Sequence, residues 1–432
     1  MRALPVPPRH PAAARGLVTG SGLRQAALNV AHPAALWLAA ALFAARDVYV
    51  AAVAPHPDAI AFLAAGHALL SHPSDLYRAT AEYMARTHLL VPNDPPRYFL
   101  SPAPQAVLAA PFSLLPSPAG ELAWLAVDRA CVVLALLLLF RHLALRDRRG
   151  RPLFWLVAAY FPPLMAELAA GQRGGLILLL AVAAVIFEVR KPALAGALAG
   201  AAASLKFYPA AMVLGAGPRR LATFGGAMTL AFLSISLLAF APFGGPLQYV
   251  GGVLLPATSP ADPACGINSV HTLWMRTVGG APYVVSWQGH PVTIRSPVQL
   301  PELARALVYA TDLLLVLVAL AAARASGWAP GYGLLLGFAL GALIPGEAYQ
   351  YQLLPLLPLA LLVTARSVER GSWKVPLGVG VAMLGFLAPP CFVPVPYVWT
   401  LAALGVFASG AAAFRLFGRD AGPTSSRQPR SG

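Results

Sequence analysis

The chain has few charged residues and few cysteines. Only 11% of its 432 residues are charged, and 58% are apolar, whereas ordinary soluble domains have about 25% charged residues. This composition excludes a soluble globular protein and a disordered one. The three cysteines, at 131, 265 and 391, fit neither a zinc-site spacing nor a disulfide framework. Because no metal-ligand cluster, nucleophile elbow or phosphate loop is found either, we expect no metal and no cofactor.

Long apolar runs are abundant, and the mean hydropathy is +0.67. The fold class predicted from them is all-α: a polytopic integral membrane protein with about twelve transmembrane helices. One apolar stretch, 192–216, is interrupted at Ser204–Pro209, so we interpret it as two short helices that meet at a break. Ten full crossings are predicted at 33–54, 119–143, 152–168, 173–189, 221–242, 303–323, 328–345, 350–366, 374–391 and 397–415.

The basic residues predict the orientation in the membrane. The net charge is +15, but most of the cations fall in loops on one side, as the positive-inside rule requires, so no nucleic-acid partner is expected. We therefore predict a multi-pass membrane protein with both termini cytoplasmic. Residues 1–32 form a cytoplasmic segment, 33–415 one transmembrane domain, and 416–432 a disordered cytoplasmic tail. The long outer loops are 55–118 and 243–302.

The first outer loop begins with a candidate catalytic carboxylate, Asp58. Its segments 58–70 and 76–90 predict short helices at the membrane surface, and 101–116 predicts a short interfacial or re-entrant helix. Asp58 opens an apolar helix, so it is either an N-cap or first-turn acid stabilised by the helix dipole, or a general base. Asp47 is the competing base, unless it only pairs with Arg46.

Several further ionisable residues lie in or near the spans, where they are costly and therefore functional candidates. Lys206, at the predicted break, has no place in the positive-inside pattern, and it is interpreted as an anion contact or a snorkelling lysine. Asp128 and Arg129 are interpreted mainly as structural pairing groups. Glu167 and Arg173 bracket Gly171-Gln172 in an outer turn, which is either an ordinary polar turn or part of a sugar site.

The second outer loop and one later turn supply the remaining candidates. Asn268, Thr272 and Arg276 would share one helix face, and amide, hydroxyl and cation together suit a ligand with hydroxyl and phosphate groups. The turn 345–352 contains an acid, amides and aromatic rings, which are either site residues or members of an interfacial aromatic belt. The additional candidates from these two segments are His271, Glu347, Tyr349 and Gln350.

These motifs, taken in order, resemble a known family. The chain is similar over about residues 40–365 to the GT-C glycosyltransferases of family 87, the bacterial polyprenol-phosphate-dependent mannosyltransferases. The motifs that carry the resemblance are Asp58–Gly66, Asp75-Leu76-Tyr77, Ser101–Pro104 leading to Pro116, Gly171-Gln172, Lys206 with Pro209, Asn268-Ser269 with Arg276, and the apolar helix after Pro345.

The resemblance implies an inverting hexosyltransferase that moves a sugar, expected to be mannose, from a polyprenyl-phosphate donor to a lipid or glycan acceptor. It implies Asp58 as the base and Lys206 and Arg276 as contacts of the donor phosphate. The expected substrate-binding residues are Gln172, Asn268, His271, Glu347, Tyr349 and Gln350. The alternative is a lipid or solute transporter or flippase, in which Lys206, Asp128 and Arg129 would line a pathway; a third is a non-catalytic membrane assembly factor.

Overall fold

The computed structural model describes residues 20–54, 56–71, 76–77, 101–145, 150–243, 245–251, 269–287, 290–344, 349–387 and 398–417. Helices dominate these ranges, which confirms an all-α polytopic membrane protein. Within them six helical segments are long and apolar enough to cross a membrane. These are in α1 (Gly20–Val53), α5 (Ser117–Leu143), α10 (Pro218–Phe240) with η3 (Ala241–Phe243), α14 (Pro301–Ala325), η5 (Gln350–Leu353) with α16 (Leu356–Glu369), and α18 (Val398–Ala412) with η7 (Ala413–Leu416).

A bent pair of helices makes a seventh candidate span. α6 (Gly150–Tyr160) and α7 (Pro162–Ala170) meet at 47°, where Pro162 and Pro163 cannot continue a helical hydrogen-bond ladder. Five predicted membrane or surface segments are shorter apolar helices, of 10 to 17 residues, which is less than the roughly 20 residues of a full crossing. They are α2 (Pro57–Ser71), α8 (Gly174–Phe187), α9 (Pro192–Leu205), α15 (Tyr332–Leu343) and α17 (Lys374–Leu384).

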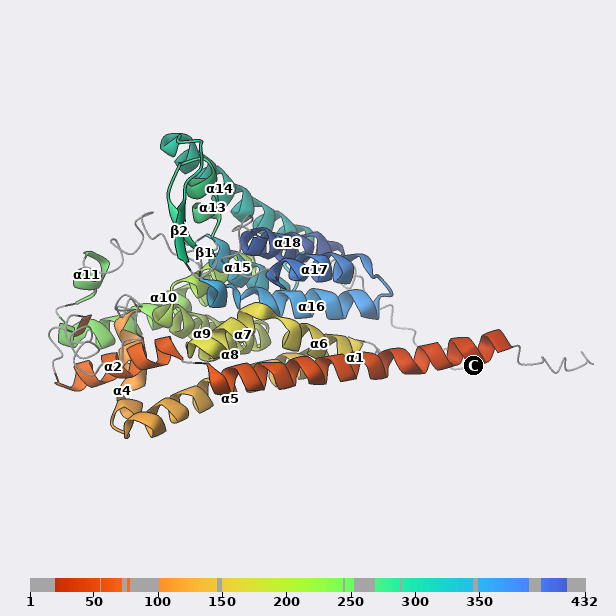
Figure 1. Cartoon of the computed structure of the whole chain (residues 1–432), viewed down its shortest axis with the longest axis horizontal. Helices are drawn as coiled ribbons and strands as arrows, with labels where there is room; N and C mark the ends of the chain where they lie inside the picture. The colour runs from red at the N-terminus through yellow and green to blue at the C-terminus, as the bar shows by residue number, and fades with distance from the viewer. Residues whose placement is uncertain are drawn as a thin grey trace, which may run out of the picture.

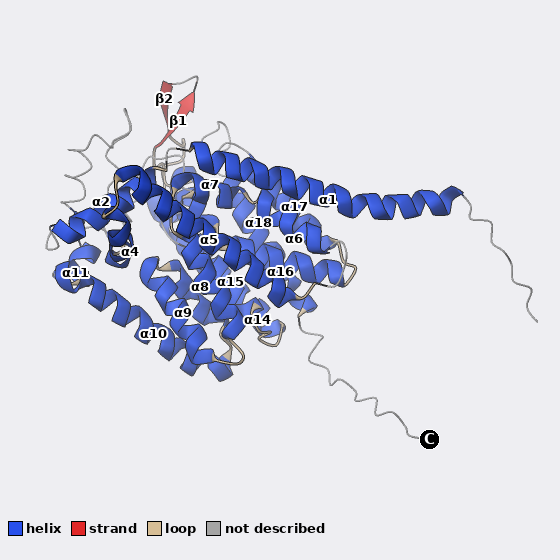
Figure 2. Ribbon diagram, turned by 90° about the horizontal axis from the view of Figure 1, so that it is seen from below, coloured by secondary structure: helices blue, strands red, loops and turns tan. Residues whose placement is uncertain are grey.

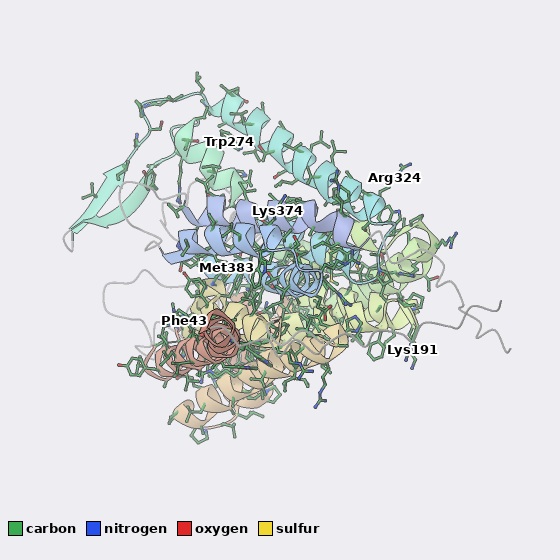
Figure 3. All side chains as sticks on the ribbon, turned by 90° about the vertical axis from the view of Figure 1, so that its right-hand side faces the viewer. Phe43, Lys191, Trp274, Arg324, Lys374 and Met383 are labelled. Carbon is green, nitrogen blue, oxygen red and sulfur yellow. The ribbon has the colours of Figure 1, made fainter. Side chains whose placement is uncertain are left out.

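The remaining elements are short. They include the predicted loop helix, α4 (Ala103–Ser113), whereas most of the predicted helix 76–90 lies outside the described residues. A two-stranded antiparallel hairpin, not predicted from the sequence, projects from the helical body (Figures 2 and 3). The bounds of the others are η2 (Tyr208–Gly215), α11 (Pro246–Tyr249), α13 (Val270–Thr277), β1 (Tyr283–Trp287), β2 (His290–Ile294) and η6 (Gly385–Leu387).

Proline explains where many helices begin. The chain has 42 prolines, and α4, α5, α7, α9, α10 and α14 each have proline in their first two positions. Proline is tolerated there because the first amides of a helix have no partner within the helix. The described part of this proline-rich chain is therefore still mostly helical.

The predicted break within 192–216 is confirmed. α9 ends at Leu205, Lys206 has an extended backbone with φ −146° and ψ 138°, and the chain continues as the 3₁₀ helix η2. This second half packs against α15, every residue of which is buried. Gly333, Gly337 and Gly341 line the contact, where a Cβ would collide with the main chain of η2. Lys206 therefore lies between α9 and η2, and η2 is packed closely on α15.

The elements that carry the candidate site lie close together. α2, α4 and α11 gather at one end of the molecule, while the N-terminal part of α1 extends past the other helices at the opposite end (Figures 1 and 2). α2 packs on α4 and α5, and α1 lies along α6 and α7. The turn between α7 and α8 thus meets the start of α2.

Candidate active site

One amide joins the carboxylate of Asp58 to the ammonium of Lys206. Gln172 Nε2 donates to Asp58 Oδ2 at 2.7 Å, and Gln172 Oε1 accepts from Lys206 Nζ at 2.9 Å. The two partners fix the orientation of the Gln172 amide, because a carboxylate only accepts hydrogen bonds and an ammonium only donates them. The structure therefore brings together three residues that the sequence singled out separately.

Local sequence explains how these three groups meet. Asp58 is in the first turn of α2, where a negative charge is favoured by the helix dipole. Gln172 follows Gly171, the left-handed residue that ends α7 at φ +71°. A Cβ on Gly171 would lie 2.8 Å from the Cβ of Ala59. Only glycine therefore lets this turn lie directly on the first turn of α2, beside Asp58.

Two buried carboxylates hold the other side of the turn. Glu167 of α7 accepts from the backbone N–H of Gly174, and Asp128 of α5 accepts from the N–H of Leu176 at 3.3 Å. Both amides belong to the first turn of α8, which has no side-chain cap from Arg173, its N-cap residue. The two acids supply that cap from neighbouring helices, which is favourable because helix N-termini attract negative charge.

Arg173 secures the turn rather than pointing to open space. Its guanidinium carbon lies 3.2 Å from the ring centroid of Trp124, and its Nη1 donates to the Trp124 carbonyl at 3.3 Å. The indole N–H of Trp124 in turn donates to the carbonyl of Gly171 at 3.1 Å. Arg173 is only 2% exposed. Of the two interpretations of this turn, the structural one therefore fits Arg173.

An aromatic pair flanks the lysine. The Lys206 ammonium lies 5.0 Å from the ring centroid of Tyr351, which stacks on Tyr349 with 5.6 Å between centroids. Tyr351 belongs to η5 and Tyr349 is its N-cap residue, and η5 packs against α7. A cation over an aromatic face is attracted by the ring quadrupole. Tyr349, predicted as a substrate contact, is thus linked to Lys206 through Tyr351.

Asp47, the competing candidate for the base, has a different environment. Its Oδ1 accepts from Nε and Nη2 of Arg46, at 3.1 and 2.8 Å. Arg46 also donates to the carbonyl of Ala159, at the bend between α6 and α7, at 3.4 Å. The contacts of Asp47 are therefore those of the pairing alternative.

A second polar chain anchors the start of α2. His56 Nε2 lies 3.2 Å from Arg129 Nη2, and His56 Nδ1 lies 3.2 Å from Glu121 Oε1. Because a guanidinium only donates, Nε2 must accept, so Nδ1 carries the proton and donates to Glu121. Arg129 and Glu121 both belong to α5. They therefore fix the residue that precedes α2, two positions before Asp58.

This arrangement combines a carboxylate that can take a proton with an ammonium that can stabilise a leaving anion. Such a pair is what a group transfer to a hydroxyl requires. A family comparison assigns the same class of reaction: residues 99–345 match the model of glycosyltransferase family 87. The chain belongs to glycosyltransferase family 87. No curated protein and no solved structure matches the chain significantly.

The other predicted residues of this glycosyltransferase lie on α13 or outside the described ranges. Arg276 is 2% exposed, with its guanidinium 5.4 Å from the Tyr283 ring. Burial lowers the pKa of His271, so its imidazole is neutral at pH 7. The hydroxyl of Thr272 is used in a capping box with Ser269 at the start of α13. Asn268 and Glu347 lie outside the described residues.

The glycosyltransferase also has a polar contact that sequence reasoning missed. Trp274 of α13 donates from Nε1 to Thr311 of α14 at 2.9 Å, where the two helices meet (Figure 3). The next residue, Asp312, lies in the middle of a span, and its buried Oδ1 has no hydrogen-bond partner among the described residues. The sequence could have pointed to Asp312, because an acid within an apolar span is a functional candidate. In the described part of the chain, no group of three or more His, Cys, Asp or Glu side chains is placed to hold a metal ion.

Proposed function

We propose that this glycosyltransferase moves mannose from a polyprenyl-phosphate donor to a lipid or glycan acceptor on the outer face of the bacterial inner membrane. Both termini are then cytoplasmic, as the distribution of basic residues predicts. Nucleotide sugars are made inside the cell, so an outward-facing transferase needs a sugar that is already attached to a membrane lipid. The Asp58–Gln172–Lys206 chain is the observation that carries this proposal.

In this mechanism Asp58 is the general base. The acceptor hydroxyl oxygen attacks the anomeric carbon from the face opposite the phosphate, and Asp58 takes the hydroxyl proton. The bond between the anomeric carbon and the phosphate oxygen breaks, and polyprenyl phosphate leaves with the electron pair. The configuration at the anomeric carbon is therefore inverted.

Lys206 and Arg276 stabilise the leaving phosphate. An ammonium has three donors, of which one goes to Gln172, and Arg276 adds a second fixed cation. The aromatic rings of Tyr349 and Tyr351 provide a surface on which a sugar ring can pack. His271, Gln350, Asn268 and Glu347 remain candidate contacts to substrate hydroxyls.

The test is transfer of sugar by the purified full chain from radiolabelled polyprenyl-phosphate mannose to a bacterial lipid extract. Asp58→Asn is nearly isosteric but cannot accept the proton, so it should cut kcat by about 10²- to 10⁴-fold while donor binding and folding remain. If Asp58 were only a stabilising acid in the first turn of α2, the Asn variant would keep its rate. The matched control is Asp47→Asn, which should leave kcat unchanged.

A further inference from the structure

Glu167 is a buried carboxylate that the proposed mechanism does not use. It is 1% exposed, and its Oε1 accepts from the backbone N–H of Gly174. Its Oε2 is buried and has no hydrogen-bond partner among the described residues. The charges of Lys206, Asp128 and Asp58 lie close enough to act on it. An acid that is costly to bury thus lies beside the candidate site.

The space at Gly174 is filled by this carboxyl group. A Cβ added to Gly174 would lie 2.5 Å from Cδ and Oε1 of Glu167 and 2.8 Å from its Oε2. No other residue at 174 fits while the Glu167 carboxylate keeps its position. The position of the Glu167 carboxylate therefore depends on glycine at position 174.

Glu167 also holds the chain on the other side of Gln172. Its backbone carbonyl accepts from the N–H of Gly171 at 3.1 Å and from the N–H of Gln172 at 3.4 Å. Glu167 therefore accepts hydrogen bonds from the backbone N–H groups of Gly171, Gln172 and Gly174.

We propose that Glu167 is a positioning residue for sugar transfer: it fixes the turn 171–174 and so holds the Gln172 amide between Asp58 and Lys206. This inference rests on the proposed roles of Asp58 and Lys206. Reactive groups that move by about 1 Å can lose about 100-fold in rate. The competing interpretation is that Glu167 only caps α8 and contributes to stability alone.

Glu188 provides a matched control. It is also 1% exposed, and its Oε2 accepts from the backbone N–H of Gly331, at the start of α15, at 2.6 Å. Its other oxygen pairs with Arg220, not with a residue of the candidate site. Glu188→Ala should therefore lower the melting temperature without changing kcat per folded molecule.

The variants Glu167→Ala, Glu167→Gln and Gly174→Ala separate the two interpretations in the full chain, with radiolabelled polyprenyl-phosphate mannose as the donor. Glu167→Ala should lower kcat about 100-fold with little change in the donor KM, and Glu167→Gln, which keeps an acceptor oxygen, should restore most of the rate. Gly174→Ala displaces the carboxylate and should resemble Glu167→Ala. Combining the two should add little further loss, because both break the same contact.

A second readout does not depend on activity. Amide hydrogen exchange of residues 171–176 should become faster in Glu167→Ala but not in Glu188→Ala. Unchanged exchange there, equal kcat in the Glu167→Ala and Glu188→Ala variants, or a Gln variant as slow as the Ala variant would each overturn the positioning role. Failure of the wild-type chain to transfer mannose would instead overturn the proposed function, whatever the exchange rates show.

Discussion

Replacing Gln172 with leucine tests whether the amide acts as a bridge or as a substrate contact. Leucine has a similar volume but can neither donate to Asp58 nor accept from Lys206, so both contacts, of 2.7 and 2.9 Å, are lost. The sequence predicts Gln172 as a substrate-binding residue. We propose instead that it orients Asp58 and Lys206, because its amide is hydrogen-bonded to both.

The size of the effect follows from the partners of the amide. A hydrogen bond to a charged group contributes about 1.5 to 3 kcal/mol. Each 1.36 kcal/mol is tenfold in rate, so losing the equivalent of one such bond in the transition state gives about a 10- to 150-fold fall in kcat. Leaving two half-buried charged groups without this partner should also lower the free energy of unfolding by about 1 to 3 kcal/mol.

Initial rates at several donor concentrations separate the two roles. A bridge predicts a lower kcat with a nearly unchanged donor KM, whereas a direct substrate contact predicts a higher KM. Gln172→Glu sharpens the comparison, because it can still accept from Lys206 but cannot donate to Asp58. The control is Tyr332→Phe, which removes buried hydrogen bonds of 2.9 and 3.0 Å to the carbonyls of Gly410 and Ala411.

The control should lose stability but keep its kcat, because Tyr332 lies at the start of α15 and contacts α18 and Phe417 rather than the turn. A Gln172→Leu variant with wild-type kcat and a raised donor KM would refute the bridge and support the predicted substrate contact. An unchanged kcat and KM would remove Gln172 from the site.

Three further predictions concern charge and topology. Lys206→Met and Arg276→Met should each weaken donor binding or slow transfer by the equivalent of about 1.5 to 3 kcal/mol; unchanged kinetics in both would exclude phosphate contacts. Asp312→Leu should raise the melting temperature, because it removes an acid from the middle of a span; a lower melting temperature would mean that the acid is stabilising. Single cysteines at Ser74 and Ser286, in a chain lacking native cysteines, should react with an impermeant thiol reagent in spheroplasts, and protection of both would reverse the predicted orientation.

The short helices show where prediction from hydropathy reached its limit. The apolar windows 173–189, 328–345 and 374–391 do contain helices, but α8, α15 and α17 have only 14, 12 and 11 residues. Hydropathy reports that a segment avoids water, and it cannot distinguish burial in lipid from burial in protein. α15, buried along its whole length, is the clearest case.

The sequence by itself determined the class of protein, the helical segments, the break at Lys206 and the candidate residues Asp58, Gln172 and Lys206. These follow from local chemistry, because lipid requires apolar helices and makes each charge within them conspicuous. Only the tertiary structure decided that one amide joins Asp58 to Lys206, across 114 and 34 positions of sequence. It also decided that Glu167 and Asp128 cap α8 from neighbouring helices. Such contacts depend on how the helices pack, and helical periodicity in one segment contains no information about which side chain of another segment will face it.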